Sequence, residues 1–440
     1  MQKIFAILKE KYIIFEVVLL SLYKVFFDLC VMPAYFDIFS YMHGYGYKLI
    51  IGKWIVSNIV FILLLFLLEM KIKKEKKSSS FVLRLYSILC VIPCLSLFSG
   101  IECFKYKFLV LILIFWFIFM CLIKFIPYAA NSDDIETTEI TKKEKKLVNI
   151  LIVSIIAFSF FAWIWYGCPI VTGFSDANAQ RLLNRENQLP TILGYAHIII
   201  GGVGLPFFIA YGIEKRNKFW VLGCLFAALL MFFTNGMKTW LLNYIFIFVF
   251  LIADKIVKKD AELFNIGMEI MVVFTSIVSV AFCKLIDLDS LIGIFGRITI
   301  VPNTVGLKSL EFFETNELLY LRESVLRFWF DTPYKNGSDF YIFYGENSDI
   351  TSSRWNNGLW GDAFRNFGVV GMFTYPIIIG ITIKVIEICT KDHSQWFQNF
   401  MIFILIWSGI NTSYFAWLLS GGVIFLALMS KIFAEKKVKV

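Results

Sequence analysis

Apolar runs of about 20 residues alternate along the chain with short strips rich in lysine and other polar residues. A helix rises about 1.5 Å per residue, so such a run spans the hydrocarbon core of a bilayer, which is about 30 Å thick. The pattern predicts an all-α polytopic membrane protein with about twelve transmembrane helices. We expect these helices at 12–32, 49–69, 81–100, 107–127, 147–166, 190–212, 219–235, 239–254, 263–284, 367–388, 399–413 and 416–433.

The lysine-rich strips predict the orientation of these helices. Short cytoplasmic loops carry an excess of Lys and Arg, which sets the topology of a membrane protein. In a twelve-helix arrangement every strip falls on the same side, and both termini are therefore expected in the cytoplasm. The strips lie at 71–77, 142–146, 215–218, 255–259 and 436–439.

The composition agrees with a membrane protein. Apolar residues make up 59% of the 440 residues and charged residues 17%, whereas soluble domains average about 45–50% and about 25%. A soluble enzyme, a nucleic-acid binder and a disordered scaffold are excluded as the main body of the chain. The net charge of +9 is explained by lysine-rich cytoplasmic loops, so it does not indicate a nucleic-acid partner.

Two segments on the opposite, exterior side are too polar to be simple connections. The first is 167–189, and the second is 285–366, between the ninth and tenth predicted helices. Loops of such length usually carry function. Within the larger one we expect short amphipathic helices, for example at 305–328, lying near the outer membrane surface.

The arginines are distributed differently from the lysines. Arg84 and Arg216 fall on the cytoplasmic side, and the other seven of the nine fall in the two exterior segments. A guanidinium forms a planar, bidentate fork with phosphate, which an ammonium cannot do. The distribution favours an anionic exterior ligand such as a lipid-linked pyrophosphate, although pairing with loop carboxylates is the alternative for any single arginine. The seven are Arg181, Arg185, Arg297, Arg322, Arg327, Arg354 and Arg365.

Two short segments place cations near the exterior end of the central helices. In NAQRLLNREN, Arg181 and Arg185 are four residues apart and would share one helix face. Two like charges on one face repel each other unless an anion lies between them. In TNGMKTW, a tight turn leaves Lys238 at the membrane edge, where topology does not favour a positive charge.

Two further segments flank the large exterior loop. FGRITIVPN places Arg297 shortly after the ninth helix, close to the membrane interface. NNGLWGDAFRNFGVVG leads into the tenth helix, with Asp362 and Arg365 three residues apart. These two side chains either form a local ion pair and helix cap, or Asp362 positions an acceptor hydroxyl or acts as a base.

Polar residues inside the predicted helices carry less functional signal. Lys24 and Asp28 are four apart and are expected to neutralise each other. His197, beside Tyr195, fits a hydrogen-bonded core histidine better than a catalytic one. No HExxH zinc motif occurs, and we expect neither a catalytic metal nor a cofactor.

Three motifs together resemble the Wzy-type oligosaccharide repeat-unit polymerases of O-antigen and capsule. They are the basic turn NGMK between two central helices, the RIxxxP stretch from Arg297 to Pro302, and the pattern GxxGDAxxNFGxxG from Gly358 to Gly371. The last is the most specific. The resemblance covers about 170–390 by motif, and the rest of the chain by hydropathy alone.

The resemblance implies a membrane-embedded, GT-C-like glycosyltransferase in the bacterial plasma membrane. Such enzymes join undecaprenyl-diphosphate-linked oligosaccharides on the outer face, alongside a flippase and a chain-length regulator. By position, Arg181, Arg185, Lys238 and Arg297 would bind diphosphate, Asp362 and Arg297 would be catalytic, and Arg365, Arg354 and Arg327 would bind the acceptor or order the loop. The general base stays open among Asp176, Asp287, Asp289 and Glu323.

Three other functions compete with this interpretation. An O-antigen ligase-like transferase would usually carry a histidine in the large exterior loop, and 285–366 has none. A lipid-oligosaccharide flippase or other transporter would place charge in a central cavity and show two related halves, which the sequence lacks. A scaffold or receptor of an envelope assembly is the non-catalytic alternative.

Overall fold

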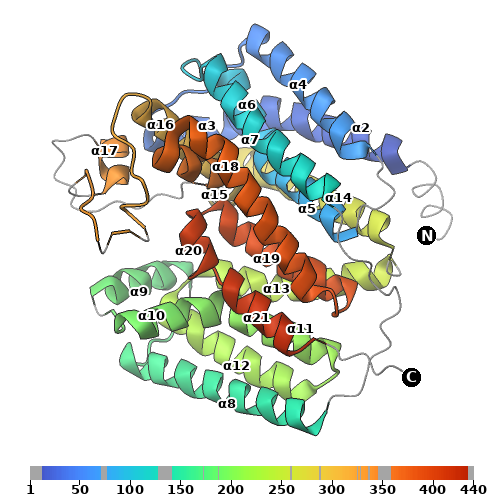
Figure 1. The fold of residues 1–440 in the computed structure, drawn as a ribbon, viewed down its shortest axis with the longest axis vertical. Helices are drawn as coiled ribbons and strands as arrows, with labels where there is room; N and C mark the ends of the chain where they lie inside the picture. The colour runs from blue at the N-terminus through green and yellow to red at the C-terminus, as the bar shows by residue number, and fades with distance from the viewer. Residues whose placement is uncertain are drawn as a thin grey trace. The chain divides into compact units, whose positions relative to one another are not determined.

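The computed structural model describes most of the chain as helices joined by short connections (Figure 1). The contacts between its residues divide the chain into two compact units. Unit 1 comprises Met1–Tyr128, Asp260–Lys384 and Ile406–Phe415, and unit 2 comprises Ala129–Lys259, Val385–Leu405 and Ala416–Val440. The residues described are 12–70, 77–126 and 141–434, apart from 172, 187, 258–259, 287–288, 325, 328, 335–336 and 345–357.

Ten helices of the described chain are long and apolar enough to cross a membrane, so the chain is a multi-pass membrane protein. Each coincides with a predicted helix. The other two predicted helices are also helical: 12–32 lies within a continuous helical stretch from Tyr12 to His43, and 399–413 overlaps the 16-residue helix α19 (Gln395–Ile410). The ten are Ile51–Glu69, Ser78–Gly100, Tyr106–Phe125, Lys142–Trp165, Thr191–Glu214, Lys218–Asn235, Thr239–Ile256, Glu262–Leu285, Leu359–Thr390 and Tyr414–Ile432.

Unit 1 is built around one central helix. The apolar stretch of Ser78–Gly100 is buried throughout, whereas only 22% of the apolar stretch of Ile51–Glu69 is buried and its exposed apolar side chains present a face suited to lipid. The predicted pair of Lys24 and Asp28 is confirmed, with 2.5 Å between Nζ and Oδ2. The framework helices are α2 (Tyr12–Phe26), α3 (Met32–His43), α4 (Ile51–Glu69), α5 (Lys77–Tyr86), α6 (Ile92–Gly100), α7 (Tyr106–Phe125) and α14 (Ala261–Ile286).

Three of the long helices contain a π-helical turn directly before a proline. The turns are Phe27–Val31, Ser87–Val91 and Ile200–Gly204, and in each case the second residue of the following α-helix is a proline. Proline has no N–H and its ring clashes with the carbonyl four residues earlier. The wider turn accommodates this clash without ending the helix.

Unit 2 packs its helices closely against one another. α12 (Lys218–Asn235) lies along both α8 (Lys142–Trp165) and α11 (Leu205–Glu214), as Figure 1 shows. Close packing requires a small residue at Gly212, where a Cβ would lie 3.0 Å from the Val221 side chain. Other helices of this unit are α9 (Phe174–Glu186), α10 (Thr191–Ile199), α13 (Lys238–Ile256) and α21 (Val423–Ile432).

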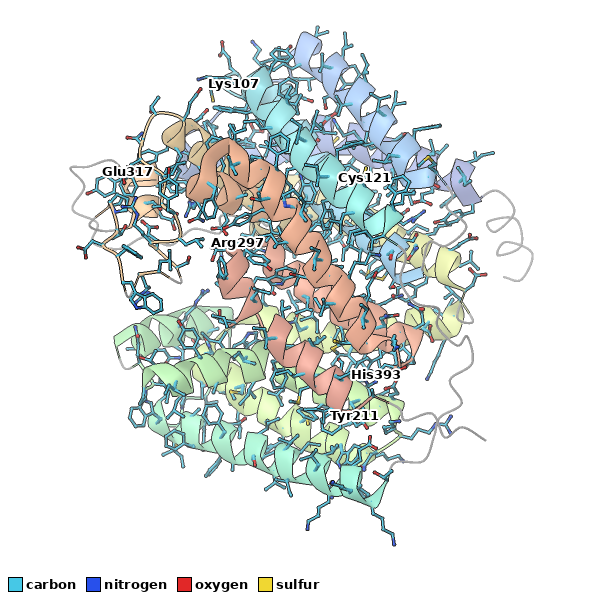
Figure 2. The ribbon with its side chains drawn as sticks, viewed as in Figure 1. Lys107, Cys121, Tyr211, Arg297, Glu317 and His393 are labelled. Carbon is cyan, nitrogen blue, oxygen red and sulfur yellow. The ribbon has the colours of Figure 1, made fainter. Side chains whose placement is uncertain are left out.

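A buried polar contact fixes the start of α19 in unit 2. Glu214, the last residue of α11, accepts a hydrogen bond from the backbone N–H of Ser394 at 2.7 Å. It also pairs with His393 Nδ1 at 2.9 Å. The His393 ring lies against Tyr211, and both are labelled in Figure 2.

Candidate functional site

In unit 2, the first exterior segment folds as a helix that packs onto the TNGMK turn. α9 (Phe174–Glu186) contains both Arg181 and Arg185, as their spacing predicted. Gly236 ends α12 with a φ of +62°, and a Cβ there would lie 2.2 Å from the carbonyl oxygen of Ala177 in α9. The Asn184 amide donates to the Thr234 carbonyl in the same turn. Two segments about 50 residues apart thus form one surface.

The backbone of α9 and α13 gives the positions of the three cations on this surface. Arg181 is exposed on α9. Arg185 follows it by four residues, about one turn later on the same face, and Lys238 is the first residue of α13, two residues after Gly236. The fold therefore joins, within one unit, the two basic segments that the sequence singled out separately.

His197 lies buried beneath this surface. Thr234 Oγ1 donates to the Met231 carbonyl at 2.8 Å and lies 3.0 Å from His197 Nε2. Because the only hydroxyl proton of Thr234 is used, His197 Nε2 must donate, and Nδ1 is left as the acceptor. The ring packs edge-on against Trp240 at 5.5 Å. This is the hydrogen-bonded histidine that the sequence favoured, now located beside the basic turn.

Replacing Gly236 by alanine is expected to lower the free energy of unfolding by about 2–4 kcal/mol. The added Cβ would meet the Ala177 carbonyl, and alanine is strained at a positive φ. Gly167→Ala is the matched control, since Gly167 has a φ of +82° and open space around it. Its expected cost is about 1–2 kcal/mol. Thermal unfolding of both purified variants measures the difference, and equal losses would contradict the packing of α9 on the turn.

In unit 1, the beginning of the large predicted loop is a helical hairpin that folds back into the unit. It consists of α15 (Asp289–Thr299) and α16 (Val301–Phe313). At its turn, the Asn303 amide donates to the carbonyl of Cys90, near the middle of the central helix, at 3.4 Å. At the other end of α16, Tyr45 Oη donates to Glu311 at 2.5 Å. The hairpin therefore enters the unit and returns, as re-entrant segments of membrane proteins do.

This hairpin differs from the amphipathic surface helix expected over 305–328. α16 is buried along most of its length and ends at Phe313. Its hydroxyl side chains are compatible with burial because they donate to carbonyls of their own helix, as Thr304 does to Ile300 and Ser309 to Val305. Because these polar side chains are hydrogen-bonded within their own helix, they do not need water, and the helix can be buried instead of lying at the membrane surface.

Arg297, which is labelled in Figure 2, lies in the last turn of α15. The residue is exposed. Its neighbour Gly296 packs directly on the Tyr35 ring, where a Cβ would lie 2.2 Å from Cε2. Tyr35 lies eight residues, or about two turns, before the end of α3 at His43. Arg297 thus belongs to the helical body of unit 1. Within the described chain it makes no hydrogen bond and no ion pair.

The segment that begins at Gly358, GLWGDAFRNFG, packs on the turn of the same hairpin. Gly358 has a φ of +61° and lies against Pro302, with 3.3 Å from a Cβ position to the Pro302 carbonyl oxygen. Trp360 Nε1 donates to Asn303 Oδ1 at 3.1 Å. The Trp360 ring fills the space above Gly306, where a Cβ would lie 2.5 Å away. The two sequence motifs of unit 1 are thus in direct contact.

α18 (Leu359–Thr390) contains a sharp break at Gly368, with φ 56° and ψ −137°. Beyond it, the chain folds back on the first part of the helix, because a Cβ at Gly371 would lie 2.0 Å from the carbonyl oxygen of Ala363. In one straight helix these residues would be about 12 Å apart. The glycines of the GxxGDAxxNFGxxG motif therefore permit a reversal and a close approach of backbone.

Asp362 is buried, and both of its carboxylate oxygens accept hydrogen bonds. Oδ2 accepts from the backbone N–H of Tyr414 at 2.9 Å, and Oδ1 from the Asn366 amide at 3.0 Å. Tyr414 begins α20 (Tyr414–Leu418). Asp362 therefore caps a helix that lies far away in sequence, which is a positioning role.

Arg365 connects three segments of unit 1. Its Nη2 donates to Asp339 Oδ1 at 2.9 Å and to Ser309 Oγ at 3.1 Å, and its side chain is buried. Asp339 belongs to the short helix α17 (Ser338–Tyr344). Glu323, one of the candidate bases, accepts from the Ser338 N–H at 2.6 Å. Both contacts hold α17 in place, so Arg365 has the geometry of a residue that orders the loop.

The remaining candidate residues are less informative. Arg327 is exposed in the turns that follow α16, and Arg322 pairs with Glu317 at 2.6 Å. Arg354 and Asp287 lie outside the described residues. Sequence reasoning missed Asn303, whose only signal was a polar residue inside an apolar stretch.

The fold thus defines an all-α, multi-pass membrane protein with a helical hairpin that folds back into unit 1. No protein-family model, no curated protein and no solved structure matches the chain, so its function has to be inferred from its own residues and geometry.

Proposed function

We propose that the chain is a membrane-embedded glycosyltransferase that polymerises undecaprenyl-diphosphate-linked oligosaccharides into a surface polysaccharide. In this proposal the growing glycan is transferred from its lipid diphosphate to the next lipid-linked repeat unit, on the outer face of the bacterial plasma membrane. The product is an O-antigen or a capsule, and the partners are a flippase and a chain-length regulator. The resemblance of the three sequence motifs supports this choice.

The proposal rests mainly on one observation, that Arg297 has no carboxylate partner in the described chain. Other arginines of the predicted exterior segments have carboxylate partners, as Arg322 has Glu317 and Arg365 has Asp339. Arg297 is exposed within a helical hairpin, and in the described chain it has no such partner. An exposed guanidinium without a counter-ion is available to bind an anion, which supports an anionic ligand at this position. A diphosphate fits the guanidinium fork.

The proposed chemistry needs a cation at the leaving group. An acceptor hydroxyl attacks the anomeric carbon of the growing glycan, a new C–O bond forms, and the bond to the diphosphate breaks. The diphosphate leaves with the electron pair, and the hydroxyl proton passes to a base. Arg297 would stabilise the charge that develops on the diphosphate. In unit 2, Arg181, Arg185 and Lys238 are the candidates for holding a lipid diphosphate.

Deleting the gene and analysing the lipid-linked glycans tests this function. A polymerase predicts that single repeat units accumulate on the cell surface. Long polymer that stays attached to its lipid would instead identify a ligase-like transferase. Repeat units confined to the cytoplasmic leaflet would identify a flippase, and unchanged glycans would contradict all three enzymatic or transport functions.

A further inference from the structure

Three glutamates surround one arginine inside unit 1, at a place that the proposed transfer does not use. Arg84 of α5 donates from Nη2 to Glu16 of α2 at 2.9 Å. The same guanidinium lies 3.4 Å from Glu69, the last residue of α4, and 3.5 Å from Glu269 of α14. All four side chains are at least nine-tenths buried. We call these four residues the Arg84 cluster.

The guanidinium cannot satisfy all three carboxylates. Glu16 takes both the Nε and the Nη2 sides of Arg84, and Ser80 Oγ accepts from Nη1. Glu269 is left with two buried oxygens that accept no hydrogen bond. An ionised carboxylate offers about four acceptor positions, and burying it without a donor is strongly unfavourable.

A second buried group in the same place also needs a donor. Asn265 lies one turn before Glu269 on α14, and its amide donates to Ser80 Oγ at 3.3 Å. Its Oδ1 is buried and accepts no hydrogen bond. Three acceptor atoms on one face of α14 therefore accept no hydrogen bond. Arg84 Nε also makes none, although it lies 3.5 Å from Glu269 Oε1, so the guanidinium does not supply the donor in this arrangement.

Two lysines and a tyrosine lie around the cluster, and none of them donates a hydrogen bond to Glu269. Lys124 of α7 donates to the carbonyls of Leu67 and Leu68 at 2.8 Å and 2.6 Å. Lys384 of α18 donates to Ser79 Oγ at 2.8 Å. Tyr12 of α2 lies with its ring 5.5 Å from the Arg84 guanidinium. These contacts leave the two oxygens of Glu269 without a donor.

We propose that the Arg84 cluster is a proton-binding site, and that Glu269 carries the bound proton in the folded protein. A carboxylic acid supplies the missing donor and removes one negative charge from a site that has three carboxylates and one guanidinium. Among the described residues no group of acidic, His or Cys side chains is arranged to hold a metal ion, which favours a proton over a multivalent cation. The bound proton allows α14 to pack against α2 and α5.

The pH dependence of stability follows from this assignment. The folded protein binds a proton that the unfolded chain releases, so its stability falls as the pH rises from the ordinary glutamate range, about pH 4.3, to the point where Glu269 ionises in the folded protein, and levels off above that point. Across that interval we expect the midpoint of thermal unfolding of the purified full chain to fall by about 1–3 °C per pH unit.

Glu269→Gln tests the site, because glutamine has the shape of the protonated acid and cannot ionise. This variant should fold, should keep its unfolding midpoint across the same pH range, and should exceed the wild-type midpoint at the alkaline end. Its infrared spectrum should lack one band of a protonated carboxylic acid that wild type shows. Glu102→Gln, at an exposed position in the connection before α7, is the matched control and should leave both the slope and the band unchanged.

Three results would overturn the proposal. The first is a wild-type midpoint that does not change with pH, and the second is a Glu269→Gln chain that fails to fold or loses stability equally at every pH. The third is a wild-type midpoint that rises with added sodium or potassium at fixed alkaline pH while Glu269→Gln does not respond. That outcome would assign the site to an alkali cation.

Discussion

Replacing Arg297 by alanine is expected to abolish chain extension, with a loss of about 10²–10³-fold in the rate of polymer formation. Removing one group that stabilises developing charge costs this much in other enzymes. Arg297 is exposed and has no ionic partner in the described chain, so the variant should remain folded in the membrane. The measurement is the length distribution of surface glycan in cells that carry the variant, together with its amount in the membrane fraction.

Two further variants make this result interpretable. Arg297→Lys keeps the charge but loses the bidentate fork, so it should restore extension only in part. Arg216→Ala removes an exposed arginine from the turn before α12, on the predicted cytoplasmic side, and should leave the glycan unchanged. Normal polymer length in Arg297→Ala would refute the diphosphate-binding role of this residue.

Replacing Asp362 by alanine is expected to destabilise unit 1 by about 3–5 kcal/mol. Two buried hydrogen bonds to a carboxylate are lost, each contributing about 1.5–3 kcal/mol, and the Tyr414 N–H and the Asn366 amide are left without their acceptor. The expected result is a lower unfolding midpoint and less folded protein in the membrane. Thermal unfolding in detergent measures the first, and quantitative immunoblotting of membranes measures the second.

This variant also separates a positioning role from a catalytic one. Asp331→Ala is the control, because Asp331 is exposed in the segment between α16 and α17 and its loss should cost little stability. If Asp362→Ala retained wild-type stability and lost chain extension, Asp362 would act on the substrate directly. Loss of both in proportion would support the capping role that its hydrogen bonds describe.

Parts of both candidate sites could be predicted because they depend on local spacing. Arg181 and Arg185 share a helix since they are four residues apart in a segment that forms α9. Lys24 and Asp28 pair for the same reason. Local spacing also allows a pair between Asp362 and Arg365, but it does not predict their partners in other segments. Asp362 accepts a hydrogen bond from Tyr414, and Arg365 donates one to Asp339.

Hydropathy alone does not predict the structure of the large loop, 285–366. Its first part reads as an exterior segment because polar residues interrupt the apolar ones. In the structure, Thr299 donates to the Phe295 carbonyl and Asn303 to the Thr299 carbonyl, so the helices conceal their own polar groups. An average over a sequence window counts these side chains as polar, although within the fold they need no water.

The sequence by itself determined that this protein is helical and crosses a membrane many times. The physical reason is that lipid offers no hydrogen bonds, so each long apolar run must satisfy its own backbone as a helix. Tertiary structure alone decided that α15 and α16 fold back into unit 1, that Asp362 caps a helix 52 residues away, and that α9 lies on the Gly236 turn. Those contacts join segments far apart in the chain, and their partners are chosen by packing and hydrogen bonding in three dimensions, which no local pattern records.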